Sequence, residues 1–187
     1  VLPSDRQVER QSAYFQRLDA NKDGVVTLEE FMAQADRNFA RCDVNKDGKT
    51  DIIAGARWFE APDWKVHDIW KHKKFYYTKG YSDSFLNFAT DVNEDGWVDL
   101  ICFDFPGREV YWLENPAGVE SLWKRNLIDS VASNESPMMV DIDSDGKQDL
   151  VFGNEKLGQM SWFSASVKNK KVTWKRNPIS ETNSKGV

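Results

Sequence analysis

The sequence repeats one acidic segment three times at nearly even spacing, and this repetition limits the folds that the chain can adopt. The segment reads DVNKDGKTDI from Asp43, and it recurs as DVNEDGWVDL from Asp91 and as DIDSDGKQDL from Asp141. The starting points are 48 and then 50 residues apart. A period of this length predicts an array of similar structural units, each built from a loop and the segments that follow it.

Short apolar segments follow each copy and predict buried strands. They read DIIAG, DLICF and DLVFG and begin at Asp51, Asp99 and Asp149. Tryptophan-containing strands are expected next, with Trp58, Trp64, Trp112, Trp123, Trp162 and Trp174 at repeating positions. Turn signals between these segments predict a small antiparallel sheet of three or four strands in each unit. The repetition favours core packing for these tryptophans, whereas Trp70 and Trp97 are expected to be the exposed ones.

The loop and strand pattern resembles the calcium loop of FG-GAP or VCBS repeats, which is the blade motif of integrin-type β-propellers. The resemblance covers about residues 39–180. It implies a mainly β domain over residues 42–187, with three propeller blades at about 42–88, 89–137 and 138–180. Such propellers usually have four or more blades. Three blades therefore predict an open or incomplete propeller, a part of a longer chain, or closure by another chain through an adhesive blade edge.

The same resemblance assigns calcium ligands at positions 1, 3, 5, 7 and 9 of each loop, with a backbone carbonyl at position 7. These residues are Asp43, Asn45, Asp47, Lys49 and Asp51; Asp91, Asn93, Asp95, Trp97 and Asp99; and Asp141, Asp143, Asp145, Lys147 and Asp149. The first loop can also be interpreted as an EF-hand loop. Another acidic loop begins upstream at Asp19, and the distance between the two loops is similar to that in paired EF-hands. Position 12 is Ala54 rather than Glu, so we favour the blade interpretation.

The N-terminal stretch, residues 1–41, predicts a helix, a loop and a second helix. Positions 1, 3, 5, 7, 9 and 12 of a twelve-residue loop are occupied by Asp19, Asn21, Asp23, Val25, Thr27 and Glu30. Ca²⁺ takes six to eight oxygen ligands, and Gly24 at position 6 permits the sharp turn around the ion. The carbonyl of Val25 and a bidentate Glu30 complete the set. This loop resembles the EF-hand family, which implies a small helical calcium-binding unit.

The charge balance also favours bound cations. The predicted ligands include 13 of the 30 acidic residues, which leaves 17 acids against 25 Lys and Arg in the rest of the chain. Clustered carboxylates repel one another unless a cation lies between them. We expect about four Ca²⁺ ions, and Mg²⁺ is a weaker candidate because it requires stricter octahedral geometry.

Composition and motifs also limit the classes of function. A net charge of −5 argues against nucleic-acid binding, and the sequence contains no apolar run long enough to span a membrane. No catalytic motif was found, so an enzyme is the weaker hypothesis. His67 and His72 are not spaced as a typical metal pair, and the basic aromatic stretch 71–79 is interpreted as a solvated connection. The carboxylates Glu60, Asp63, Asp83 and Glu135 are candidates for glycoside chemistry only if the fold brings two of them together.

These observations lead to two hypotheses. The first is a calcium-stabilised, secreted, extracellular or periplasmic binding module for a glycan or a protein, since millimolar Ca²⁺ fills weak loops outside the cell. The alternative comes from the resemblance, because some FG-GAP propellers are similar to sugar lyases and dehydratases. Whether Cys42 and Cys102 form a disulfide cannot be read from their spacing.

Overall fold

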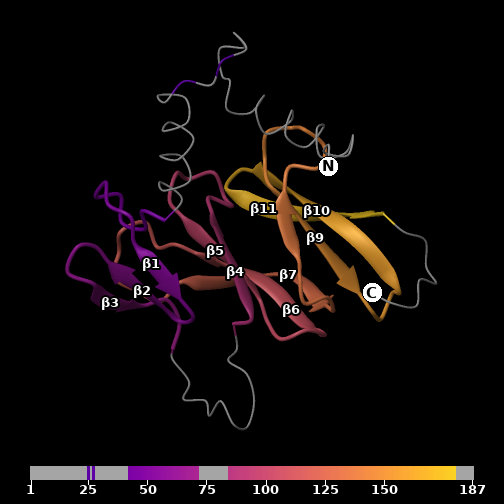
Figure 1. Cartoon of the computed structure of the whole chain (residues 1–187), viewed down its shortest axis with the longest axis horizontal. Coiled ribbons are helices and arrows are strands. Elements are labelled where there is room, and N and C mark those ends of the chain that lie inside the picture. The colour runs from indigo at the N-terminus through magenta and orange to yellow at the C-terminus, as the bar shows by residue number, and fades with distance from the viewer. Residues whose placement is uncertain (1–24, 26, 28–41, 72–83, 180–187) are drawn as a thin grey trace, which may run out of the picture. The chain divides into compact units, whose positions relative to one another are not determined.

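The structure, a computed structural model, describes residues 25, 27, 42–71 and 84–179 (Figure 1). The chain divides into two units, Val1–Arg41 and Cys42–Val187, and nearly all described residues lie in the second. The helices predicted in the N-terminal unit lie outside the described residues. Every regular element in the described part is a β-strand. None of the described segments is a helix with the length and apolarity that crossing a membrane requires.

Three antiparallel sheets make up the described part of the second unit. The first contains β1 (Ile52–Ala54), β2 (Arg57–Glu60) and β3 (Lys65–Asp68), in the order β1-β2-β3. The second contains β4 (Leu86–Thr90), β5 (Asp99–Phe103), β6 (Arg108–Glu114) and β7 (Lys124–Ala132), in the order β4-β5-β6-β7. The third contains β8 (Met138–Val140), β9 (Asp149–Asn154), β10 (Gln159–Lys168) and β11 (Lys171–Pro178), in the order β11-β10-β9-β8. The prediction of one small antiparallel sheet per unit is confirmed.

The three sheets lie side by side in chain order, from the indigo β1–β3 to the orange and yellow β8–β11 (Figure 1). Each repeated loop leads into an equivalent strand, which is β1, β5 or β9. The second and third loops are also preceded by a strand, β4 or β8, that pairs with the strand after the loop. No described strand takes this place before the first loop, so the first sheet has three described strands where the others have four.

The second sheet is buried on both faces, and the alternation along its strands divides the core in two. Successive side chains of a strand point to opposite faces. Leu100 and Cys102 of β5 pack with Trp58 and Ile69 toward the first sheet. On the other face, Phe103 lies edge-on to Phe152, with ring centroids 5.4 Å apart, in the core that joins the second and third sheets. This two-sided burial explains the continuous apolar run of β5.

One strand prediction needs correction, because β1 is not buried. Its Ile52 is 50% exposed, whereas every residue of β5 is buried. The segment after the first loop is apolar like its two counterparts. The difference is its neighbourhood, since β2 is the partner of β1 among the described residues and β5 lies between two strands within its sheet.

The prediction of core tryptophans is correct for three of the six, and the two positions expected to be exposed are at least partly buried. Trp58, Trp112 and Trp123 are buried, as the repetition predicted. Trp64 instead lies 49% exposed in the turn between β2 and β3, with a φ of 56°. Trp97, which was expected to be exposed, is partly buried, and Trp70 packs against the core between the first and second sheets. Trp162 and Trp174 are partly buried, so tryptophans at repeating positions differ in exposure.

Candidate metal centres

The three repeated loops share one backbone conformation. The residue at position 4 has a positive φ in each loop, of 60° at Lys46, 59° at Glu94 and 64° at Ser144. The glycine at position 6 also has a positive φ, between 82° and 88°. These two left-handed residues turn the chain twice within six residues. In the third loop the carboxylates at positions 1, 3 and 9 lie within 4.8 Å of one another, whereas the described residues of the first and second loops form no equivalent group of three carboxylates.

Hydrogen bonds from the loop backbone hold these acidic side chains. In the first loop, the Asp47 N–H donates to Asp43 Oδ1 at 3.1 Å and to Asn45 Oδ1 at 3.2 Å. The N–H of Gly48 donates to Asp43 Oδ2, and that of Lys49 donates to Asp47 Oδ1. The second loop has the equivalent bonds at Asp91, Asn93 and Asp95. In these two loops the N–H of position 5 donates to the side-chain oxygens of both position 1 and position 3. These oxygens therefore lie close to each other.

The aspartate at position 9 closes each loop in a buried position. Asp51 accepts from the N–H groups of Val44 and Ala61, each at 2.9 Å. Asp99 likewise accepts from Val92 at 3.0 Å and from Asn115 at 2.8 Å. These residues were predicted as ligands alone, and the structure gives them a second role. Asp51 and Asp99 each connect the start of the loop to the residue that follows β2 or β6.

The third loop differs in a way that bears on metal binding. Asp149 accepts from the Ile142 N–H at 2.9 Å, and the described residues supply it with no second backbone donor. Here β10 continues as a ten-residue strand past the point where β2 and β6 end. Asp141 Oδ1 is buried and accepts no hydrogen bond in the described structure. The carboxylate oxygens of Asp141, Asp143 and Asp149 lie within 4.8 Å of one another.

This arrangement fits a hard cation. An oxygen that is buried without a hydrogen-bond donor is costly unless another positive group approaches it. Three converging carboxylates, with Asp145 held beside them by the Lys147 N–H at 2.8 Å, are the kind of donor set that Ca²⁺ prefers. The carbonyls of Lys49, Trp97 and Lys147 remain predicted ligands, since the described contacts of these residues involve other atoms.

The aspartate at position 9 has a raised pKa in all three loops, and the cause is the same. Burial raises the pKa of Asp51, Asp99 and Asp149, because it disfavours the charged form. The effect is largest for Asp99, whose pKa rises to about 7 even though two backbone N–H groups counteract the shift. The neighbouring aspartates at positions 1 and 5 raise it further. A bound cation would reverse this penalty by stabilising the ionised carboxylates.

Side chains also connect neighbouring loops. The Lys46 ammonium of the first loop lies over the Trp97 ring of the second, 4.5 Å from its centroid. Glu94 of the second loop accepts a hydrogen bond from Lys147 of the third. Both lysines lie in loops that carry several carboxylates, so these contacts place positive charge between adjacent acidic sites.

Asn115 is a residue of this site that the sequence reasoning missed. The sequence around it, Asn-Pro-Ala-Gly, predicts only a turn. Its Nδ2 donates to the carbonyls of Val44 and Val98, at 3.0 and 2.9 Å, and its N–H donates to Asp99. One buried amide therefore joins the first loop to the second. The local sequence, Asn followed by Pro, signals a turn but does not indicate a partner 71 residues away.

The comparisons with known families agree with this geometry. Residues 91–152 match the model of the FG-GAP-like repeat, and residues 11–33 match the model of the EF hand. The chain carries an FG-GAP-like repeat and an EF hand. The FG-GAP-like match includes the second and third loops, whereas the first loop lies outside it. No curated protein and no solved structure matches the chain. Together, the two motifs indicate a calcium-binding interaction module.

Several other predicted residues can be placed. The EF-hand ligands lie outside the described residues except Val25 and Thr27, which are exposed. His67 lies in β3 beside Glu60, and His72 and Asp83 fall outside the described part. Cys42 and Cys102 are present as thiols.

Proposed function

We propose that the chain is a calcium-stabilised extracellular binding module with a glycan or protein ligand. In this proposal the three sheets are blades of an open or incomplete β-propeller over residues 42–187, preceded by an EF-hand unit over residues 1–41. The chain binds about four Ca²⁺ ions. The observation that carries the proposal is the third loop, in which a buried Asp141 oxygen without a hydrogen bond lies among three converging carboxylates.

The role of the ion follows from the place of the loops in the fold. The second and third loops precede central strands of their sheets, β5 and β9, and the first precedes β1. In all three loops a backbone N–H group donates to the closing aspartate. Bound Ca²⁺ supplies positive charge that compensates the repulsion within each cluster. The aspartates and asparagines of the loops would hold the ion, and the loops in turn would fix the start of the strand that follows each of them. Weak loops of this kind are filled at millimolar calcium, which supports a secreted or periplasmic location.

Calcium stoichiometry tests the proposal directly. The full chain, stripped with a chelator, is dialysed to equilibrium at millimolar CaCl₂, and bound calcium is counted per chain. We expect about four ions and a melting temperature that rises by at least several degrees, because ligand binding to the folded state stabilises it. Binding of one ion or none, or an unchanged melting temperature, would contradict the proposal.

Variants assign the ions to individual loops. The double substitution Asp141→Asn with Asp145→Asn should remove one ion from the count, because amides are poorer calcium ligands than carboxylates. The matched control is Glu109→Gln with Glu155→Gln, which removes two negative charges outside the loops and should leave the count unchanged. Equal losses in both variants would indicate nonspecific binding to surface acids.

Association through an open sheet edge, or completion of the propeller by a longer chain, is part of the same proposal. An unpaired strand edge presents backbone donors and acceptors that can pair with another chain. Light scattering of the calcium-loaded chain over a hundredfold range of concentration distinguishes a stable monomer from a concentration-dependent assembly.

A further inference from the structure

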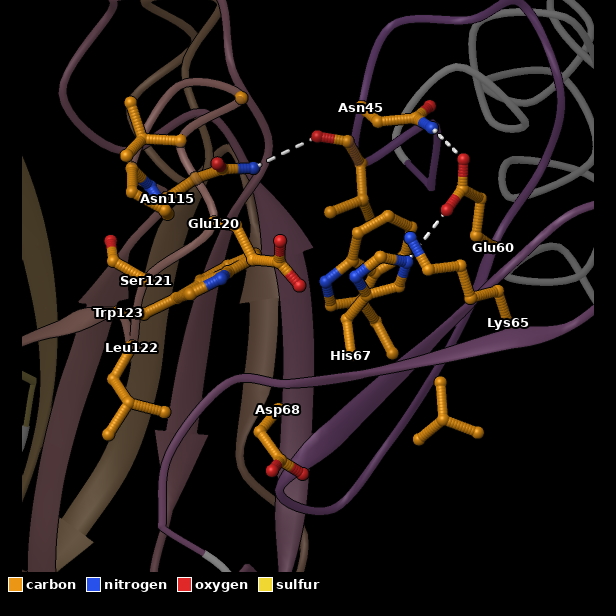
Figure 2. Close-up of a pocket in the computed structure, with 16 residues that line it drawn as sticks. Asn45, Glu60, Lys65, His67, Asp68, Asn115, Glu120, Ser121, Leu122 and Trp123 are labelled. Carbon is orange, nitrogen blue, oxygen red and sulfur yellow. Dashed lines mark hydrogen bonds and ion pairs between the residues drawn. The ribbon is translucent and has the colours of Figure 1, made fainter.

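A pocket lies between the first and second sheets, next to the first loop. Its volume is about 590 Å³, within the ~300 to 1,000 Å³ typical of small-molecule sites. Figure 2 shows two facing walls. Side chains of the first loop, β2 and β3 form one wall, and the connection between β6 and β7 forms the other.

The first wall is a connected set of side chains. The His67 ring stacks on Trp58, with centroids 4.1 Å apart and planes within 10°. His67 Nε2 lies 2.7 Å from Glu60 Oε2, and the other Glu60 oxygen accepts a hydrogen bond from Asn45 Nδ2 at 3.1 Å (Figure 2). These contacts fix the orientation of the His67 ring and of the Glu60 carboxylate, which reduces the entropy lost when a ligand binds.

The pocket offers polar and apolar contacts together. Glu120 and Ser121 line the opposite wall, and in Figure 2 the Glu120 side chain extends toward the His67 side. Half-exposed apolar side chains also occur on both walls, namely Val66, Val119 and Leu122. A pocket lined by apolar side chains together with a few polar groups is typical of a binding site.

Charge narrows the class of ligand. The pocket is lined by the carboxylates of Glu60, Asp68 and Glu120, and among the described residues that line it Lys65 is the one lysine or arginine. Asp68 is paired with Arg57 at 2.9 Å. An anionic ligand would be repelled by the remaining carboxylates. A neutral polyhydroxyl ligand fits better, because each hydroxyl can donate to a carboxylate and accept from an amide or imidazole N–H.

We propose that this pocket binds a neutral saccharide and that calcium in the first loop strengthens the binding. The proposal rests on the proposed function and identifies the ligand class and its site. The ring hydroxyls bond to Glu60, Glu120 and His67, and the apolar C–H surface of the sugar packs against the valine and leucine side chains. Volume and charge favour one or two sugar units over a uronic acid or a phosphate.

Asn45 links the pocket to the calcium loop. Its Oδ1, a predicted calcium ligand, accepts the Asp47 N–H, whereas its Nδ2 donates to Glu60. A cation bound at Oδ1 would fix the amide orientation in which Nδ2 points to Glu60. The equivalent residue of the second loop, Asn93, donates instead to Asp95 within its own loop. The two asparagines therefore occupy the same position in their loops, but Asn45 donates to a residue outside its loop and Asn93 to a residue inside its loop.

Saturation-transfer NMR and calorimetry with defined saccharides test this site. The calcium-loaded full chain is titrated with cellobiose, xylobiose, mannobiose and N,N′-diacetylchitobiose, and with digalacturonic acid as an anionic probe. We expect at least one neutral disaccharide to bind with a Kd of millimolar or lower, about tenfold weaker binding without calcium, and no binding of the diacid. Absence of binding by all four neutral probes would overturn the proposal.

Matched variants place the site and its link to calcium. Glu60→Gln should weaken binding about tenfold, the size expected for a lost hydrogen bond to a charged group, while Glu135→Gln at an exposed position should not. Asn45→Asp keeps an oxygen for calcium but loses the donor to Glu60, so it should weaken saccharide binding with the calcium count unchanged. Asn93→Asp is its control. Equal effects of Asn45→Asp and Asn93→Asp would overturn the calcium link.

The calcium count and melting temperature of each variant separate the two proposals. If wild-type chain binds four ions and is stabilised by them but binds no saccharide, the pocket proposal fails and the calcium module stands. If calcium neither binds nor stabilises, the proposed function fails first.

Discussion

At the scale of single residues, Asp99 links the stability of the metal-free protein to pH. Its pKa is about 7 in the folded state because of burial, and its ordinary value is 3.8. The folded protein therefore retains a proton between about pH 4 and pH 7 that the unfolded chain has lost. In this window the free energy of unfolding falls as pH rises, by up to about 4 kcal/mol, since each pKa unit corresponds to about 1.4 kcal/mol. Asp51 and Asp149 contribute in the same direction.

Urea unfolding of calcium-free protein at pH 5.0 and pH 7.5 measures this effect. We expect the higher stability at pH 5.0, and Asp99→Asn should reduce the difference because the amide does not titrate. With calcium the dependence should reverse, since protons compete with the ion for the carboxylates. An equal pH dependence in wild type and Asp99→Asn would assign the effect to other groups.

A second residue-scale prediction concerns Asn115. Substitution by alanine removes the donor to the carbonyls of Val44 and Val98, which are then left buried without this hydrogen bond. A buried polar group that loses its partner costs about 1 to 3 kcal/mol, so we expect a loss of about 2 to 4 kcal/mol in the free energy of unfolding. Asn126→Ala is the control, because its side chain bonds only to Lys124 at the surface. Losses of equal size would show that the bond between the loops is not important.

At the scale of elements, one ion pair joins the outer strands of adjacent sheets. Arg176 of β11 donates to Asp129 of β7, whose side chain is buried, and its guanidinium also lies 5.4 Å from the Phe163 ring centroid. Arg176→Met should cost about 3 kcal/mol, because the Asp129 carboxylate then stays buried without its cation. Asp129→Asn in the same background should recover part of the loss.

Chemical denaturation of the wild type, the two single variants and the double variant gives the coupling energy. We expect the double variant to lose clearly less than the sum of the two single losses. Additive losses would mean that the two side chains do not stabilise each other across the sheets.

The repeating elements are the part of the fold that the sequence predicts best. The turn and the strand lie in one continuous segment, which is a loop that ends in Asp and is followed by four apolar residues. The strands β5 and β9 could therefore be predicted from the local sequence pattern. The exposure of Ile52 and Trp64 could not, because it depends on which strands lie beside β1 and on the turn after β2. The contacts of Asn115 and Arg176 were also missed, since they join segments that are far apart in the sequence. The period of the sequence predicts the repeated units, whereas the residues that contact each other between units are known only from the folded structure.

At the scale of the whole second unit, the second sheet connects the other two. One core joins it to the first sheet and another joins it to the third, and the two cores lie on opposite faces of β5 and β6. The first and third sheets therefore influence each other through the second. This nearest-neighbour arrangement is typical of repeat proteins, in which a local change weakens with distance along the array.

Hydrogen exchange can test this arrangement, with a calcium loop as the point of change. Asp43→Asn with Asp47→Asn removes two predicted calcium ligands from the first loop. In millimolar calcium, we expect amides of β1–β3 to lose most protection, those of β5 and β6 to lose part, and those of β9 and β10 to change least. Asp141→Asn with Asp145→Asn makes the same chemical change in the third loop and should give the opposite order. If both variants lowered protection equally in all three sheets, the unit would open as one cooperative body, and calcium in any single loop would then stabilise the whole array.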